Sequence, residues 1–327
     1  MGIILCLLCG MLLAGCAADT PTEAPNQQTD GQETEDSTMP THPDREFTSK
    51  PTKPERRSYI FKTVGKRSLR LTFHPPTNQV YEKAPVILII PGGGYTMLNN
   101  HWISTVQATQ FKELYANGFA TAIIEYRLDS DGVLITDLIS DCMDAARFLA
   151  YYSDVLQIDT DHIITWGHSA GGALSLLMGY ADHDLFDTDH YWPEADFHVS
   201  GVFAQSPNTI SYAADGPFNG YYSGSAQSMD RLYGTEENRR LASAITHVKE
   251  GGVPCVIMMG THDPVCAPEN IPLFEAACAK VGVDCRVIWL QNADHGYLSV
   301  NGKPVTPTVD EAQSQIVAFA KQCVEGK

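Results

Sequence analysis

The sequence predicts an α/β fold: a mainly parallel central sheet of about eight strands with helices on both faces. Short, wholly apolar runs recur along the chain, as expected of strands that are covered on both faces. Segments with helical periodicity separate these runs, which is the order that builds parallel sheets. Of the 327 residues, 43% are hydrophobic, and a chain of this length can bury a substantial core.

The first two expected strands form an antiparallel hairpin, because Ser58–Val64 and Ser68–His74 alternate in polarity on either side of Gly65. The later strands are short and apolar. They are Val86–Ile90, Phe119–Tyr126, Ile163–Trp166, Val199–Ala204, Pro254–Met259 and Cys285–Leu290.

Helical patterns lie between these strands, and Gly118 and Gly282 stand where helix C-caps are expected. Residues 205–250 interrupt the alternation with Gly, Ser, Tyr and Asn, so we expect an insertion there within one domain of residues 58–327. The expected helices are Ile103–Asn117, Ile135–Tyr152, Ala170–Tyr180, Asn270–Val281 and Val309–Cys323.

The N-terminus has the pattern of a targeting signal. Ile3–Leu13 is apolar but, at about eleven residues, too short to span a bilayer. It ends in Leu-Ala-Gly-Cys, which resembles a bacterial lipobox and implies cleavage after residue 15 and a lipid on the sulfur of Cys16. We therefore expect an exported, membrane-anchored lipoprotein at the bacterial cell surface or in the periplasm. An ordinary signal peptide or a buried apolar segment is the alternative.

Residues 16–57 are rich in Thr, Pro, Glu, Asp and Gln, a composition that predicts a disordered tether. Residues 1–57 hold nine acidic and five basic side chains, which leaves −13 of the formal net charge of −17 for residues 58–327. This charge argues against nucleic-acid binding, which needs a basic surface. It also argues against adhesion to anionic lipid, so we expect membrane contact only through the lipid anchor.

Six cysteines remain after Cys16, and none is part of a Cys-x-x-Cys pair or has a His at metal-ligand spacing. The sequence therefore predicts no metal site. An even number of cysteines in an exported protein permits disulfides, but buried free thiols are the default expectation.

A nucleophile is predicted at Ser169. The pentapeptide Gly-His-Ser-Ala-Gly at residues 167–171 follows an expected strand and opens an expected helix. Such a turn strains the backbone at the serine and presents its hydroxyl at the helix N-terminus. Gly167 and Gly171 are needed because a Cβ at either position would collide with neighbouring backbone.

A serine hydroxyl needs a base, and the base needs an acid that orients it. His295 and Asp263 follow the last two expected strands, in the chain order Ser169, Asp263, His295. Asp294 competes for the acid role, but it adjoins the base in sequence and cannot easily turn back onto the ring. His168 and His262 are interpreted as lining or packing residues.

A run of glycines follows the third expected strand, in Pro-Gly-Gly-Gly-Tyr at residues 91–95. Glycines have no side chain, so their backbone N–H groups can approach a substrate oxygen. Taken together, these segments resemble the α/β-hydrolase superfamily, in particular its acetyl-esterase and hormone-sensitive-lipase-like branch, which includes xylan and feruloyl esterases. The resemblance covers roughly residues 58–325. Its matching pieces are residues 91–95, Tyr126-Arg127-Leu128, residues 167–172, Asp263-Pro264-Val265 and His295-Gly296.

The resemblance implies that the N–H groups of Gly93, Gly94 and Ala170 form the oxyanion hole. The family's loop usually reads His-Gly-Gly-Gly, and here Pro91 stands in place of that His, as in the short-chain acetyl-esterase relatives. We also expect no helical N-terminal cap and a rather open site. Tyr95, His101 and Trp102 follow the loop and are candidates for the substrate pocket.

Arg127 is interpreted as a structural ion-pair residue. Asp137, Asp141, Asp144 and Arg147 recur at helical spacing, so we expect them to cap the helix or pair locally.

The sequence therefore predicts a serine carboxylesterase without metal or organic cofactor. Its expected substrates are short-chain esters, with acetyl groups on plant polysaccharide as a candidate by family analogy. Two alternatives are a peptidase of the prolyl-oligopeptidase type and a non-catalytic surface binding protein on the hydrolase fold. The first normally carries a large gating domain, for which we expect no room in this chain.

Overall fold

The computed structural model describes residues 50–99, 108–187, 191–192, 195–211 and 226–326. These residues form an eight-stranded sheet with the order β1-β2-β4-β3-β5-β6-β7-β8. The strands are β1 (Arg57–Val64), β2 (Arg67–His74), β3 (Ala84–Ile90), β4 (Ala120–Ile124), β5 (Ile158–His168), β6 (Val199–Gln205), β7 (Cys255–Gly260) and β8 (Cys285–Leu290).

The hairpin expected at the start of the domain is present. β1 pairs with β2 in antiparallel register, and β2 pairs with β4 in the same sense. Every other neighbouring pair, from β4–β3 to β7–β8, is parallel. The carboxyl ends of six parallel strands therefore meet at one edge of the sheet, which is where open α/β sheets place their ligands.

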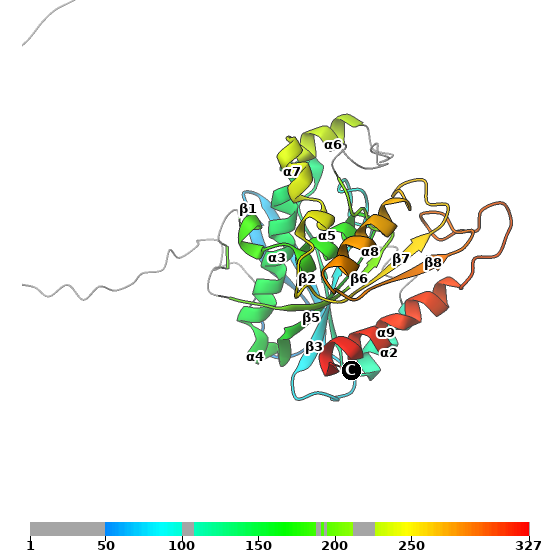
Figure 1. Cartoon of the computed structure of the whole chain (residues 1–327). Helices are drawn as coiled ribbons and strands as arrows, with labels where there is room; N and C mark the ends of the chain where they lie inside the picture. The colour runs from blue at the N-terminus through cyan, green and yellow to red at the C-terminus, as the bar shows by residue number, and fades with distance from the viewer. Residues whose placement is uncertain (1–49, 100–107, 188–190, 193–194, 212–225, 327) are drawn as a thin grey trace, which may run out of the picture. The chain divides into compact units, whose positions relative to one another are not determined.

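Helices cover both faces of this sheet (Figure 1). On one face, α2 and α9 contact each other, and their Leu114, Ile316 and Phe319 pack with Ile87 and Ile89 of β3. The other face is covered by helices that include α3, α5 and α8. The helices are α2 (Ala108–Ala116), α3 (Ile135–Tyr151), α4 (Ser153–Leu156), α5 (Ala170–Tyr180), α6 (Ala226–Tyr233), α7 (Glu236–Leu241), α8 (Asn270–Lys280) and α9 (Val309–Glu325).

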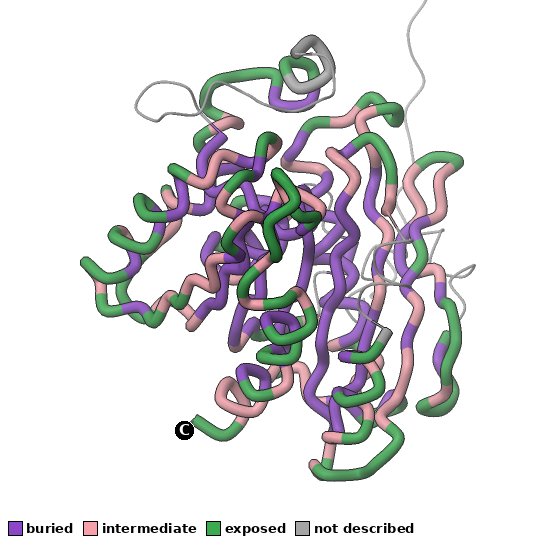
Figure 2. The backbone as a smooth tube through the Cα atoms, turned by 90° about the vertical axis from the view of Figure 1, so that its right-hand side faces the viewer, coloured by how far each residue is buried: buried purple, intermediate pink, exposed green. Residues whose placement is uncertain are grey.

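Burial follows from this layering. All seven residues of β3 and all six of β7 are buried, so the central strands form the purple interior of Figure 2, with exposed green segments on the outer sides of the helices. The predicted α/β-hydrolase architecture, with about eight mainly parallel strands and helices on both faces, is confirmed.

The chain between β6 and β7 holds α6, α7 and the short 3₁₀ helix η4 (Ala244–His247). This is the region expected as an insertion at residues 205–250, of which 212–225 lie outside the described residues. The other 3₁₀ helices are η2 (Asp129–Asp131) and η3 (His183–Phe186).

The six cysteines after Cys16 are all free thiols, and four of them, Cys142, Cys255, Cys266 and Cys278, are buried. In the described part of the chain, no helix is both long enough and apolar enough to cross a membrane.

Candidate active site

The predicted nucleophile, Ser169, lies between the end of β5 and the start of α5 with φ +58°. This left-handed backbone is strained for a residue with a Cβ. A Cβ on Gly167 would meet the Gly171 backbone, and one on Gly171 would meet the Ile90 carbonyl. Both glycines are therefore required by close backbone approach, as the sequence predicted.

The structure brings Ser169 and His295 together at the carboxyl edge of the sheet. The Nε2 atom of His295 lies 2.9 Å from the Ser169 Oγ. The two residues are 126 positions apart in the chain, and the parallel pairing of β5 through β8 places their loops at the same edge. Nε2 can accept the serine proton only if the ring's other nitrogen carries the hydrogen.

Asp263 supplies the partner that fixes this tautomer. Its Oδ2 lies 2.8 Å from Nδ1 of His295, and its side chain is fully buried. Its Oδ1 accepts the backbone N–H groups of Val265 and Cys266, at 2.8 and 2.9 Å. One oxygen is thus held by the backbone, which leaves the other directed at the imidazole.

The loops that carry the acid and the base pack directly on each other. A Cβ on Gly260, the last residue of β7, would meet the carbonyl oxygens of Ala293 and Asp294 at 2.6 Å. The N–H of His262 donates to the Ala293 carbonyl at 2.9 Å. These contacts hold the residues before His295 against the turn that carries Asp263.

The side chain of Asp294, the competing candidate for the acid, is hydrogen-bonded to the backbone of its own turn. Its Oδ1 accepts the N–H groups of Gly296 and Leu298 at 2.9 and 2.8 Å. The carboxylate hydrogen-bonded to the His295 ring is that of Asp263. Asp294 shapes the loop on which His295 stands.

The glycine loop lies beside the nucleophile turn. A Cβ on Gly92 would collide with the His168 carbonyl, and a Cβ on Gly93 with the Met97 carbonyl. Gly93 and Gly94 have φ +124° and +60°, conformations that favour glycine. Among the described residues, no acceptor is found for the N–H groups of Gly93 and Gly94. Ala170 begins α5, where N–H groups lack intrahelical acceptors.

The predicted pocket residues have different outcomes. Tyr95 is only 2% exposed and belongs to the main hydrophobic cluster. The Tyr95 ring is therefore part of the core in this structure. His101 and Trp102 lie outside the described residues, as does Cys16.

His168 has a larger role than the packing assigned to it from the sequence. Its Nε2 donates to the main-chain carbonyl of His295 at 3.0 Å. Its ring packs against that of His295, with centroids 4.9 Å apart, and edge-on against Tyr297 at 5.7 Å. The residue before the nucleophile thus holds the backbone of the base. Its place directly before the predicted nucleophile was the only sequence signal.

Burial and, to a lesser extent, the neighbouring His295 ring lower the pKa of His168 to about 3. The neutral ring makes this contact with its hydrogen on Nε2, which donates, while Nδ1 stays unprotonated. At neutral pH, His168 therefore adds no charge beside the pair of Ser169 and His295.

Within the described ranges, no group of three or more His, Cys, Asp or Glu side chains is placed to hold a metal ion. The described residues place a hydroxyl, an imidazole and a carboxylate in one hydrogen-bonded line. Beside them lies a glycine loop whose N–H groups have no side chains of their own residues in front of them. This set can transfer an acyl group through an attack by serine.

Known proteins resemble this chain in sequence and in fold. The model of the BD-FAE family matches residues 71–277, which include the glycine loop, Ser169 and Asp263. A curated relative, endo-1,4-beta-xylanase B of Butyrivibrio fibrisolvens, is 26% identical over 200 residues, covering 60% of this chain and 29% of the xylanase.

The non-reducing polyketide synthase ausA of Emericella nidulans is 25% identical over 173 residues, which is 44% of this chain and 7% of the synthase. The chain thus spans less than a third of the length of either curated relative.

Solved structures show the same fold. The apo form of esterase 2 from Thermogutta terrifontis superposes with a TM-score of 0.67 at 22% identity, covering 82% of this chain and 95% of that one. Its butyrate-bound form gives a TM-score of 0.66 at 20% identity, covering 81% and 93%.

Proposed function

The chain belongs to the BD-FAE family and is an esterase-like α/β hydrolase, and from this premise we propose that it is a serine carboxylesterase for short-chain, acetyl-type esters. The observation that carries the proposal is the line of two hydrogen bonds from Asp263 through His295 to Ser169, at 2.8 and 2.9 Å. This arrangement converts a weak hydroxyl into a nucleophile.

In the proposed reaction, Ser169 Oγ attacks the ester carbonyl while His295 Nε2 takes its proton. Asp263 stabilises the imidazolium that forms, since its Oδ2 already accepts from Nδ1. His295 then protonates the leaving alcohol, which leaves an acyl group on Ser169. Water, deprotonated by His295, hydrolyses this acyl-enzyme and restores the serine.

The N–H groups of Gly93, Gly94 and Ala170 are proposed to stabilise the oxyanion. Ala170 directly follows the nucleophile, and Gly92 packs against the carbonyl of His168, directly before it. Donors fixed before the reaction stabilise the developing charge without reorganisation, and each is worth roughly 10²–10³ in rate.

Acetyl groups on plant polysaccharide are the proposed natural substrate class. The support is the relationship to an endo-xylanase of Butyrivibrio fibrisolvens, with which this chain shares 200 aligned residues. Solved structures of esterase 2 from Thermogutta terrifontis are described as butyrate-bound and propionate-bound, which suggests the range of acyl chains to compare. The lipid anchor on Cys16 and the export of the domain are part of the same proposal.

The test is hydrolysis of p-nitrophenyl acetate, propionate and butyrate by the wild-type chain, followed by acetate release from acetylated xylan. Ser169→Ala should abolish hydrolysis, while Ser314→Ala is the matched control. Ser314 is on α9, where its hydroxyl donates to the Glu311 carbonyl, so its loss should leave the rate unchanged.

A fluorophosphonate probe should label the wild-type chain at Ser169 and leave Ser169→Ala unlabelled. A wild-type chain that neither reacts with the probe nor hydrolyses any ester would support the binding-protein alternative. Faster cleavage of a prolyl peptide than of the acetyl ester would support the peptidase.

A further inference from the structure

The glycine loop is held at both ends by one short segment of the chain. The Tyr126 hydroxyl donates to the Pro91 carbonyl at 2.7 Å, at the start of the loop. The Asp129 N–H donates to the Tyr95 carbonyl at 2.9 Å, at the end of the loop. The three glycines of residues 92–94 lie between these two contacts.

The first contact is well suited to fix the loop. Pro91 has no N–H, so its carbonyl is the one main-chain polar group through which its own residue can be held. That carbonyl shares a planar peptide unit with the Gly92 N–H, so the hydroxyl fixes the plane from which the glycine run starts. Tyr126 is fully buried, and burial raises the pKa of its phenol well above the usual value, which keeps the donated proton in place.

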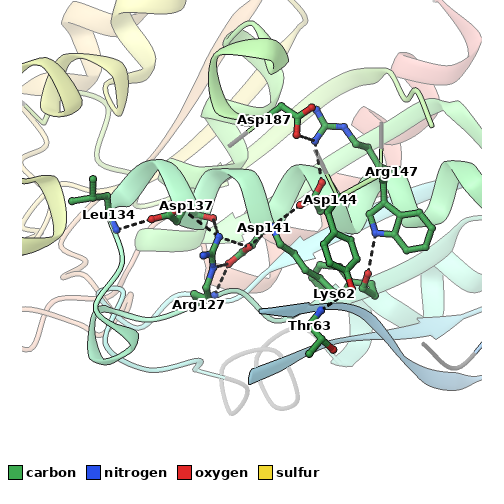
Figure 3. A network of polar contacts seen from close by, with 12 residues as sticks. Lys62, Thr63, Arg127, Leu134, Asp137, Asp141, Asp144, Arg147 and Asp187 are labelled. Carbon is green, nitrogen blue, oxygen red and sulfur yellow. Dashed lines mark hydrogen bonds and ion pairs between the residues drawn. The ribbon is translucent and has the colours of Figure 1, made fainter. Parts of the chain in front are cut away.

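The segment that holds the loop is itself anchored to α3. Arg127 donates through Nε and Nη2 to the two oxygens of Asp141 at 2.7 and 2.9 Å, and its main-chain N–H also donates to Asp141 at 3.0 Å. Figure 3 shows Arg127 directed at Asp141 on α3, with Lys62 on the other side of that carboxylate. The Lys62 Nζ lies 2.9 Å from Asp141 and 2.6 Å from Asp144.

This cluster is buried, because the side chains of Lys62, Asp141 and Asp144 are fully shielded from solvent. Buried, bidentate ion pairs of this kind are rigid and geometrically specific. The segment that carries Tyr126 is therefore held rigidly against α3. The interpretation of Arg127 as a structural ion-pair residue is confirmed, and the ion pair lies next to the residue that contacts the loop.

We propose that Tyr126 is a positioning residue for the reaction: its hydroxyl, together with the Asp129 N–H at the other end of the loop, orients the glycine loop so that the Gly93 and Gly94 N–H groups face the oxyanion. The inference rests on the proposed esterase function. Three consecutive glycines have great backbone freedom, and an oxyanion hole works only when its donors are already aligned. The Tyr126 hydroxyl thus acts on the transition state, through the loop, and has no contact with the substrate.

The decisive variant is Tyr126→Phe, with Tyr180→Phe as the matched control. Tyr180 is also buried, and its hydroxyl donates to the Val253 carbonyl at 2.9 Å, away from the glycine loop. Each variant removes one buried hydroxyl from one backbone carbonyl, so both should lose stability. Only Tyr126→Phe should lower kcat for p-nitrophenyl acetate, by about tenfold or more, with KM within about twofold of wild type.

A transition-state analogue provides a second readout. An aryl trifluoromethyl ketone forms a tetrahedral oxyanion on Ser169, so its affinity for Tyr126→Phe should fall by the same factor as kcat. A structural role alone would leave this affinity unchanged in the folded fraction. Unchanged kcat and unchanged affinity in a folded Tyr126→Phe protein would overturn the inference.

The other end of the loop gives a pair of variants that decide the question even if Tyr126→Phe does not fold. Asp129→Pro removes the N–H that donates to Tyr95, whereas Asp129→Ala keeps that N–H and removes the carboxylate, which pairs with Arg231. The inference requires kcat to fall in the first variant and not in the second. Equal kcat in the two would contradict it. If the wild-type chain hydrolyses no ester, the proposed function fails instead.

Discussion

The Nε2 atom of His168 donates a hydrogen bond to the main-chain carbonyl of His295 at 3.0 Å. This bond ties the residue before the nucleophile to the backbone of the base. A second hydrogen bond joins the His295 side chain to the Ser169 hydroxyl. The nucleophile turn and the base loop are therefore joined twice, once through reacting atoms and once through a contact that takes no part in proton transfer.

Loss of the hydrogen bond from His168 should make the position of the His295 ring less well fixed. His168→Phe keeps an aromatic ring beside Tyr297 but removes the donor, and we expect kcat for p-nitrophenyl acetate to fall about tenfold with little change in KM. His168→Gln keeps a donor on a flexible side chain and should recover much of the rate. Steady-state kinetics of the two variants test this, and equal rates would show that the hydrogen bond has no effect.

The lowered pKa of His168 also predicts how stability changes with acid. The folded pKa is about 3, against an ordinary value of 6.5, so between these pH values the unfolded chain binds a proton that the folded chain excludes. The free energy of unfolding should therefore fall as pH drops from about 6.5 towards 3, by at most about 1.4 kcal/mol per pH unit from this residue.

Urea denaturation at several pH values measures this slope. His168→Phe cannot bind the proton in either state, so its unfolding free energy should fall less steeply over the same range. A variant slope as steep as that of the wild type would show that His168 is not the group responsible.

The two neighbouring carboxylates should behave differently when neutralised. Asp263→Asn removes the acceptor for Nδ1 of His295, and kcat should fall by on the order of 10³–10⁴. Asp294→Asn keeps an oxygen for the Gly296 and Leu298 N–H groups, so kcat should stay within a few-fold of wild type. A larger loss in Asp294→Asn than in Asp263→Asn would reassign the acid.

The predicted catalytic positions could be chosen from the sequence because each follows an apolar strand and the parallel strands end at one edge. The sequence could not reveal which groups hold those residues. The Val265 and Cys266 N–H groups that fix Asp263, and the carbonyl of His295 that His168 contacts, are backbone atoms. Every residue except proline carries both a backbone N–H and a carbonyl, so no residue type marks these groups.

Two glycines of the loop should differ in their tolerance of a methyl group. A Cβ on Gly93 would collide with the Met97 carbonyl, whereas Gly94 has open space around the same position. Both have positive φ, so Gly94→Ala should cost about 1–2 kcal/mol of stability and Gly93→Ala more. Thermal unfolding and kcat should rank the two variants in that order, and the reverse order would contradict the loop geometry.

The buried ion cluster predicts a strong dependence on Lys62. Lys62→Met leaves Asp141 and Asp144 without one cation in a buried site and should lower the free energy of unfolding by about 3–5 kcal/mol. Lys83→Met is the control, because Lys83 pairs with the exposed Asp154 at the surface and such pairs contribute little. Chemical denaturation of both variants tests the contrast, and similar losses would contradict it.

The strand pattern was predicted well where strands are apolar and less well where they are not. β5 runs from Ile158 to His168, whereas the sequence indicated only Ile163–Trp166. Its first part contains Asp159 and Asp161 and pairs with the start of β3 before a register shift. Polar residues at the beginning of a strand do not form an apolar run, so hydrophobic periodicity cannot detect them.

β8, which leads to the base, is an edge strand of the sheet and the last of the described strands in chain order. On the ribosome, the glycine loop and the nucleophile turn emerge well before His295, which follows Ser169 by 126 residues. A nascent chain that stops short of His295 has a serine without a base, which is a poor nucleophile. In the proposed enzyme, hydrolytic activity would therefore arise only after β8 has docked, so that a partly synthesised chain is inert toward esters inside the cell.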